Sequence, residues 1–228
     1  MKDAKSLLDG LLGGGGLGGL ASGAKGAWDG QSGLAKGAMA GGLLGILLGG
    51  SGTRKMAKSA LKVGGAALIG GLAYKAYEDW QAGKAATPQA TDPAALPAPE
   101  GTAFLPADPI AADDLSARLL RAMVAAAKAD GHVTPTERRR IGGQLGALGL
   151  GPEAQSLIEA ELDAPLDVGA IAGLAKSEEE AAEIYAASLL VVDPDAPAEK
   201  GYLAMLAARL QLPPGLVEHL HARAASLV

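Results

Sequence analysis

The chain has 228 residues, no cysteine and a formal net charge of −5, and its length suits one or two domains. The lack of cysteine excludes disulfides, thiol nucleophiles and cysteine zinc sites. The charge is uneven, because residues 1–84 carry +5 and 23 of the 34 glycines, whereas residues 85–228 carry −10 and all 13 prolines. We expect no nucleic-acid binding by the acidic part and attraction of the basic part to anionic lipids.

The first residues, MKDAKSLLDGLLGGGG, predict a short amphipathic helix over residues 2–12 with its leucines on one side. Acidic residues interrupt the basic start, and no clean apolar stretch leads to a small-residue cleavage site. We therefore expect a cytoplasmic start instead of a secretory signal.

The stretch GLAKGAMAGGLLGILLGGSG, residues 33–52, carries glycines at a strict spacing of four: Gly33, Gly37, Gly41, Gly45 and Gly49. In water each interior glycine would cost a helix about 0.8–1 kcal/mol. In a bilayer the backbone must pair within the helix, and small residues let two helices approach closely. The stripe favours a membrane helix over about residues 35–53, packed on a partner helix or in a homo-oligomer. The alternative is a flexible glycine-rich tail.

A second apolar segment, at about residues 59–77, follows the basic turn SGTRKMAK and predicts the other arm of a membrane hairpin. Tyr74, Tyr77 and Trp80 stand at its end, where an aromatic belt would meet the membrane interface. The other interpretation makes them ordinary surface aromatics with polar edges. Membrane lipids are the expected partners of residues 1–84, whether the segments span the bilayer or lie on it.

Residues 85–110 contain six prolines and no helical period, so they predict an extended, mobile and disordered linker. Residues 111–228 predict a compact all-α domain of seven helices that is large enough to fold alone. The predicted helix starts are capping residues or N-terminal prolines: Asp113 or Asp114, Thr134, Pro152, Asp167, Ser177, Pro197 and Pro214.

Two helix junctions, AKADGHVTPTERRRI and LVVDPDAPAEKGYL, are alike. They resemble the half-repeats of the TerB-like (tellurite-resistance) domain, an all-helical fold. With the glycine-rich N-terminus and the GGLAYKAYEDWQ run, nearly the whole chain resembles YebE-like bacterial inner-membrane proteins of unknown function. The resemblance implies membrane anchorage with a cytoplasmic helical domain, and it supplies no established activity.

TerB-like domains have been linked to metal binding through acidic loop residues. The resemblance therefore implies a divalent-cation site at Asp130 and Glu137 in the first junction, and at Asp193, Asp195 and Glu199 in the second. Neither junction is an EF-hand, because Asp130 and Glu137 are seven positions apart instead of eleven. The alternative makes these residues helix caps and turn formers, with Thr134 and Glu137 as a capping box.

Of the three histidines, His219 and His221 cannot chelate an ion together, because two residues two positions apart on a helix face different sides. His132, beside Asp130, is expected to be a solvated loop residue. With no nucleophile and base in a recognisable arrangement, we expect no enzyme. The sequence favours a membrane-anchored adaptor or scaffold at the bacterial inner membrane with a protein partner and no cofactor. The alternative is a divalent metal-ion sensor or buffer.

Overall fold

A computed structural model describes residues 4, 5, 8, 65–88, 100–129, 152–192 and 196–226. Their regular elements are helices, and two isolated bridges at residues 100–105 are the β-type pairing within these ranges. The helices are α6 (Gly65–Gln81), α7 (Pro109–Ala127), α9 (Pro152–Asp163), α10 (Val168–Ala172), α11 (Glu178–Leu189), α12 (Pro197–Arg209) and α13 (Pro214–Ala225). The all-α prediction is confirmed for this part of the chain.

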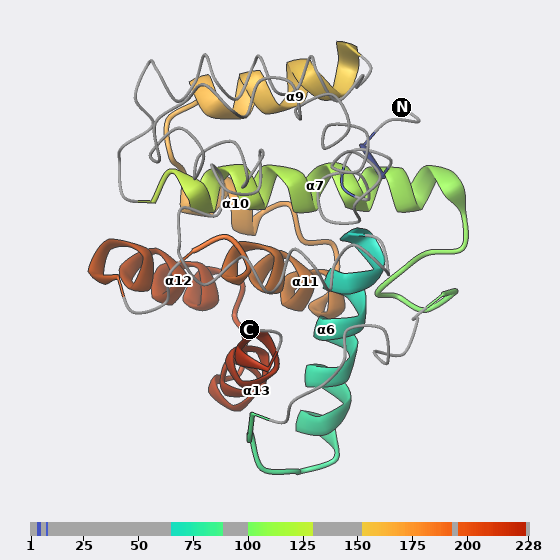
Figure 1. Cartoon of the computed structure of the whole chain (residues 1–228), viewed down its shortest axis with the longest axis vertical. Helices are drawn as coiled ribbons and strands as arrows, with labels where there is room; N and C mark the ends of the chain where they lie inside the picture. The colour runs from blue at the N-terminus through green and yellow to red at the C-terminus, as the bar shows by residue number, and fades with distance from the viewer. Residues whose placement is uncertain are drawn as a thin grey trace, which may run out of the picture.

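Helix α11 lies at the centre of the fold. It packs against α7 on one side and against α6, α12 and α13 on others, while α9 covers the far side of α7 (Figure 1). Every residue from Ala181 to Leu189 is buried, as expected of a helix that is surrounded by protein. The core therefore wraps around α11, with Ile184 and Tyr185 among its fully buried side chains.

All five predicted helix starts after residue 150 are confirmed. Pro152, Pro197 and Pro214 each occupy the first helical position of α9, α12 and α13. The Asp167 carboxylate accepts from the N–H groups of Gly169 and Ala170 at 2.8 and 3.0 Å. An aspartate that accepts hydrogen bonds from the first turn, or a proline that lacks the N–H group left unpaired there, thus marks these boundaries in the sequence.

Helix α7 begins earlier than predicted. Pro109 is its first residue, and Asp108 caps it by accepting from the Ala111 N–H at 2.9 Å. Asp113, a predicted cap, is instead buried inside the helix and accepts the Lys5 N–H at 2.9 Å. An Asp-Pro pair supplies both the cap oxygen and a preset φ, so it takes precedence over an aspartate four residues later.

The predicted membrane hairpin is not supported for its second arm. Residues 65–81 form α6, which packs against α11 and α13. Its large apolar side chains, Leu68, Ile69 and Leu72, are at most 2% exposed. Among the described helices none is long and apolar enough to cross a membrane. The apolar face that suggested a lipid contact is covered by protein, and the first arm, at residues 35–53, lies outside the described residues.

The predicted linker also differs from the structure at its C-terminal end. Phe104 and Leu105 are buried against α6, and the Phe104 ring meets Tyr74 and Tyr77 edge-on at centroid distances of 5.6 and 5.7 Å. Tyr77 in turn contacts Trp80 at 5.5 Å. Edge-to-face contacts of this kind stabilise a protein interior. The aromatic residues expected at a membrane interface thus hold residues 100–105 against α6, whereas residues 89–99 lie outside the described part.

Candidate functional site

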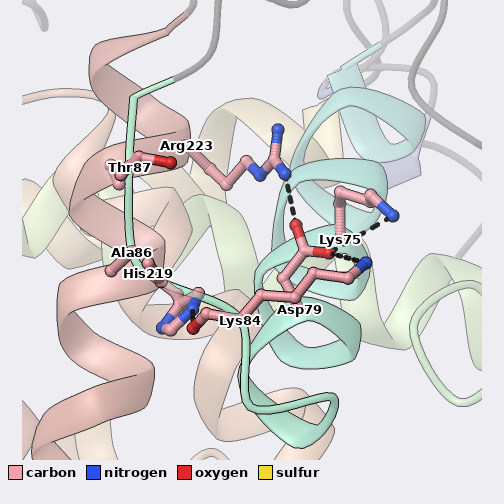
Figure 2. A pocket seen from close by; sticks show the side chains of 9 residues that line it. Lys75, Asp79, Lys84, Ala86, Thr87, His219 and Arg223 are labelled. Carbon is pink, nitrogen blue, oxygen red and sulfur yellow. Dashed lines mark hydrogen bonds and ion pairs between the residues drawn. The ribbon is translucent and has the colours of Figure 1, made fainter.

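A cavity of about 490 Å³ opens between α6, α13 and residues 82–88, which we call the return segment (Figure 2). We call it the α6–α13 cavity. Its volume lies within the range typical of small-molecule sites. Its lining combines charged side chains with small apolar ones: Lys75, Asp79, Lys84, Ala85, Ala86, Thr87, His219, Ala222 and Arg223.

Asp79 is the anionic centre of the cavity lining and is 3% exposed. Its Oδ1 accepts from Lys84 Nζ at 2.8 Å and lies 3.5 Å from Lys75 Nζ, while its Oδ2 pairs with the Arg223 guanidinium. Figure 2 shows Arg223 reaching the carboxylate from α13 and the two lysines approaching its other oxygen. One carboxylate thus ties α6, the return segment and α13 together.

The environment of Asp79 strongly favours its ionised form. Burial by itself raises the pKa of this carboxyl, but the hydrogen bonds from Lys84 and Arg223, with the charges of Arg223 and Lys75, outweigh burial and lower the pKa to about 2. The pKa of Lys75 is raised, mainly by its hydrogen bond to Glu78. Asp79 therefore stays ionised and Lys75 stays protonated across the physiological pH range.

A glycine turn positions Lys84 over Asp79. Gly83 has φ +65°, a conformation that few residues other than glycine adopt. The Lys84 N–H bonds to the Asp79 carbonyl at 3.0 Å and the Gly83 N–H to the Trp80 carbonyl at 3.0 Å, the pattern of a Schellman motif. This turn reverses the chain at the end of α6 and returns the Lys84 side chain to the face that carries Lys75 and Asp79.

His219 holds the return segment on α13. Its Nδ1 lies 2.7 Å from the Gly215 carbonyl oxygen and its Nε2 lies 3.0 Å from the Lys84 carbonyl oxygen. Carbonyl oxygens only accept, so either neutral tautomer donates to one of them and an imidazolium donates to both. The side chain thereby fixes the backbone of Lys84 as well as the lining of the cavity.

The prediction that His219 and His221 face different sides is confirmed. His221 points away from the cavity, and its Nε2 lies 2.8 Å from the Tyr185 hydroxyl on α11. Burial lowers the pKa of His221 and raises that of Tyr185 to about 12. The pair belongs to the core between α11 and α13.

The predicted metal ligands lie mostly outside the described residues: Asp130, Glu137, Asp193 and Asp195. Glu199 lies in the first turn of α12 and is half-buried. In the described ranges no three His, Asp or Glu side chains gather in a way that could hold a metal ion. Two hypotheses about these junctions therefore stay predictions, the cation site and its alternative as helix caps. The same holds for the packing role of the glycine stripe, Gly33, Gly37, Gly41, Gly45 and Gly49.

The α6–α13 cavity leaves little signal in the sequence. Lys75 and Asp79 are four positions apart on a helix, which places them on one face, and this was the local signal available. Arg223 is 144 residues from Asp79, so their pairing depends on how α6 packs against α13. A pair so far apart in the sequence belongs to no local motif.

The sequence matches the family described as "Protein of unknown function (DUF533)" over residues 33–224. The chain belongs to the DUF533 family. The matched range of this DUF533 protein includes the glycine stripe, α6 and all the charged residues of the α6–α13 cavity. The chain is also 38% identical over 96 residues to an "Uncharacterized protein in ampR 5'region" of Yersinia enterocolitica, an alignment that covers 42% of this chain and 69% of that protein. No solved structure matches it.

Proposed function

We propose that this DUF533 protein is a non-enzymatic, membrane-associated scaffold, in which residues 13–58 contact the membrane and the helical body is presented beside it. The observation that carries the proposal is the packing of α6, which follows the glycine-rich segment closely in the sequence and is fixed to α11 and α13. A membrane contact made through residues 13–58 would therefore hold the helical body close to the bilayer surface. The proposed scaffold does not require a mobile linker between the membrane segment and the helical body.

Specific side-chain contacts support a firm attachment of α6. Asp79 on α6 pairs with Arg223 on α13, and the Tyr77 hydroxyl donates to Glu178 on α11 at 3.3 Å. Trp80 packs so closely on α13 that a Cβ added at Gly215 would lie 3.2 Å from its Nε1 atom. These contacts join α6 to two helices through charge, hydrogen bonding and close packing.

The charge and composition of residues 1–84 support the membrane contact. This region carries a net charge of +5 and has no acidic or basic residue from residue 37 to residue 53. Basic residues beside an apolar segment favour anionic lipid surfaces. The proposal includes a bacterial inner-membrane location, a cytoplasmic helical body of TerB-like type, a protein partner for that body, and self-association through the glycine stripe.

Carbonate extraction of membranes from cells that express the full-length protein tests the proposal. We expect the wild-type protein to stay in the membrane pellet and a variant lacking residues 13–58 to be released. This internal deletion keeps the buried residues Ala4 and Leu8 as well as all of α6, so its circular dichroism should stay helical. Wild-type protein that washes off in carbonate would refute a firmly inserted segment and, with it, the proposed scaffold.

The substitution pair Gly41→Leu and Gly45→Leu provides a matched test of the stripe. Larger side chains should preserve membrane partitioning, because they are more apolar, while preventing the close approach of helices. We expect crosslinked oligomers of the full-length protein to disappear in this variant. Unchanged oligomers would show that the stripe is not the contact between copies.

A further inference from the structure

The lining of the α6–α13 cavity carries more positive charge than it neutralises. Among the described residues that line the cavity, three cationic side chains, those of Lys75, Lys84 and Arg223, surround one carboxylate, that of Asp79. Glu78 also pairs with Lys75, at 2.6 Å, from a position where its side chain is 48% exposed. Among the described lining residues, cationic side chains therefore outnumber carboxylates. An anion that enters the cavity would be attracted by this excess.

The two lysines leave room for a second anionic partner. Both approach the same oxygen of Asp79, Lys84 at 2.8 Å and Lys75 at 3.5 Å. Each ammonium group has three N–H donors, and one carboxylate oxygen cannot occupy all of them. The Lys84 side chain is 56% exposed, so an anion can reach it from solvent without moving a helix.

The other lining residues indicate the class of ligand. Ammonium and guanidinium groups bind phosphate oxygens through charge-assisted hydrogen bonds, and the Thr87 hydroxyl at the cavity wall can donate another. Ala85, Ala86 and Ala222 leave space beside the charged groups. A volume of about 490 Å³ exceeds that of a single oxyanion, so the ligand has room for a small organic group attached to the phosphate.

We propose that the α6–α13 cavity binds the phosphate group of a small phosphorylated molecule or of a phospholipid head group, held by Lys75, Lys84 and Arg223. Asp79 is the internal counterion that keeps these cations together before the ligand binds. This inference goes beyond the scaffold function and does not depend on it, because the cavity lies wholly within the helical body.

The first test measures binding of inorganic phosphate and of glycerol 3-phosphate to the full-length protein by calorimetry, at an ionic strength held constant with chloride. We expect Lys84→Gln to weaken binding about tenfold, through loss of one charge-assisted contact. Lys200→Gln is the matched control, since Lys200 is exposed on α12, and it should leave binding unchanged. Equal effects of the two substitutions would mean general charge screening and would overturn the proposal.

A substitution of Asp79 provides a test with the opposite sign. Asp79→Asn removes the internal counterion and should strengthen phosphate binding, whereas a purely structural ion-pair network predicts weaker binding or none. Circular dichroism checks that the variant is folded. If Asp79→Asn does not fold, the comparison of Lys84→Gln with Lys200→Gln decides the question.

Vesicles distinguish the two sources of phosphate. Protein that lacks residues 13–58, so that the proposed membrane segment cannot itself cause flotation, carries each substitution and is floated with vesicles of phosphatidylcholine alone and of phosphatidylcholine with phosphatidylglycerol. If the Lys84→Gln variant loses flotation with the mixed vesicles and the Lys200→Gln variant keeps it, the ligand is a lipid head group. If both variants float alike and only binding of the soluble phosphates depends on Lys84, the ligand is a soluble molecule. If neither flotation nor binding of the soluble phosphates depends on Lys84, the proposed phosphate site is refuted.

Discussion

Glu183 is the most unusual single residue of the helical body. It lies in the middle of α11 with no exposed surface, and neither of its carboxyl oxygens has a hydrogen-bond partner in the described structure. Burial, followed by the charge of Glu180, raises its pKa to about 9, and the opposing charge of Arg118 is too weak to prevent this. Arg118 is already paired with Glu180 at 2.8 Å. Glu183 is therefore protonated in the folded protein at neutral pH.

This protonation makes stability depend on pH in a predictable direction. The unfolded chain ionises Glu183 above a pKa of about 4.5, whereas the folded protein keeps the proton up to about pH 9. The contribution of this carboxyl to the free energy of unfolding is therefore fully present below about pH 4.5, and it is lost as pH rises toward 9. Between pH 7 and 8.5 the free energy of unfolding should fall by up to about 1.4 kcal/mol per pH unit from this group.

The substitution Glu183→Gln should remove this slope, which urea unfolding of the full-length protein at pH 7 and pH 8.5 can measure. Glu159→Gln, at an exposed position of α9, is the control and should keep the wild-type slope. The buried tyrosines do not interfere, because the pKa values of Tyr185 and Tyr202 are raised to about 12. A Glu183→Gln variant with the wild-type slope would mean that this carboxyl is ionised in the folded state.

At the scale of elements, the contact between α6 and residues 100–105 decides how the chain enters α7. Phe104 is 4% exposed and lies between Tyr74 and Tyr77. The Gly101 N–H bonds to the Leu105 carbonyl at 3.0 Å, and Gly101 adopts φ +76°, so the loop closes into a compact turn under the ring. The single aromatic side chain is the anchor of this loop.

Phe104→Ala should therefore destabilise the full-length protein by about 3–5 kcal/mol, the usual cost of truncating a buried phenylalanine. Phe104→Leu keeps much of the apolar volume and should cost less than half as much. Urea unfolding monitored by circular dichroism gives both values. A loss below about 1 kcal/mol for Phe104→Ala would show that the loop does not need this anchor.

A second element-scale feature joins α7 to α9. The Lys128 ammonium donates to the carbonyl oxygen of Glu161 in the last turn of α9, at 2.6 Å, and to that of Ala164, the residue that follows the helix. Arg121 donates to the Glu161 carboxylate at 2.8 Å. A cation at a helix C-terminus satisfies carbonyls that have no partner within the helix. These contacts hold α9 along the outer side of α7.

At the scale of the whole molecule, α6 shares one core with the helices that follow residue 108. Its buried face is covered by α11 and α13, and removing it would expose the matching apolar surfaces of those helices. The sequence predicted that residues 111–228 would fold alone. The packing of α6 leads us to the opposite expectation for that fragment.

A fragment of residues 111–228 should aggregate or bind a hydrophobic dye without a cooperative thermal transition, because about 20–33 cal/mol is lost for each Å² of apolar surface left uncovered. A fragment of residues 60–228, which keeps α6 and Phe104, should unfold cooperatively. Scanning calorimetry and dye binding compare the two. Cooperative unfolding of residues 111–228 with no dye binding would show that α6 is dispensable for the core.

The helical class of the described part and the five helix starts after residue 150 could be predicted from the sequence alone. Pro152, Asp167, Ser177, Pro197 and Pro214 act within their own first turns, and such local interactions can be read from neighbouring residues. What covers the apolar face of α6 could not be predicted in this way, because it depends on how distant helices pack against each other. An apolar helix face can be covered by lipid or by protein, and the hydropathy pattern is the same in both cases, so composition could not distinguish these two environments. The α6–α13 cavity was likewise set by packing, because Asp79 and Arg223 come together only when α6 lies against α13.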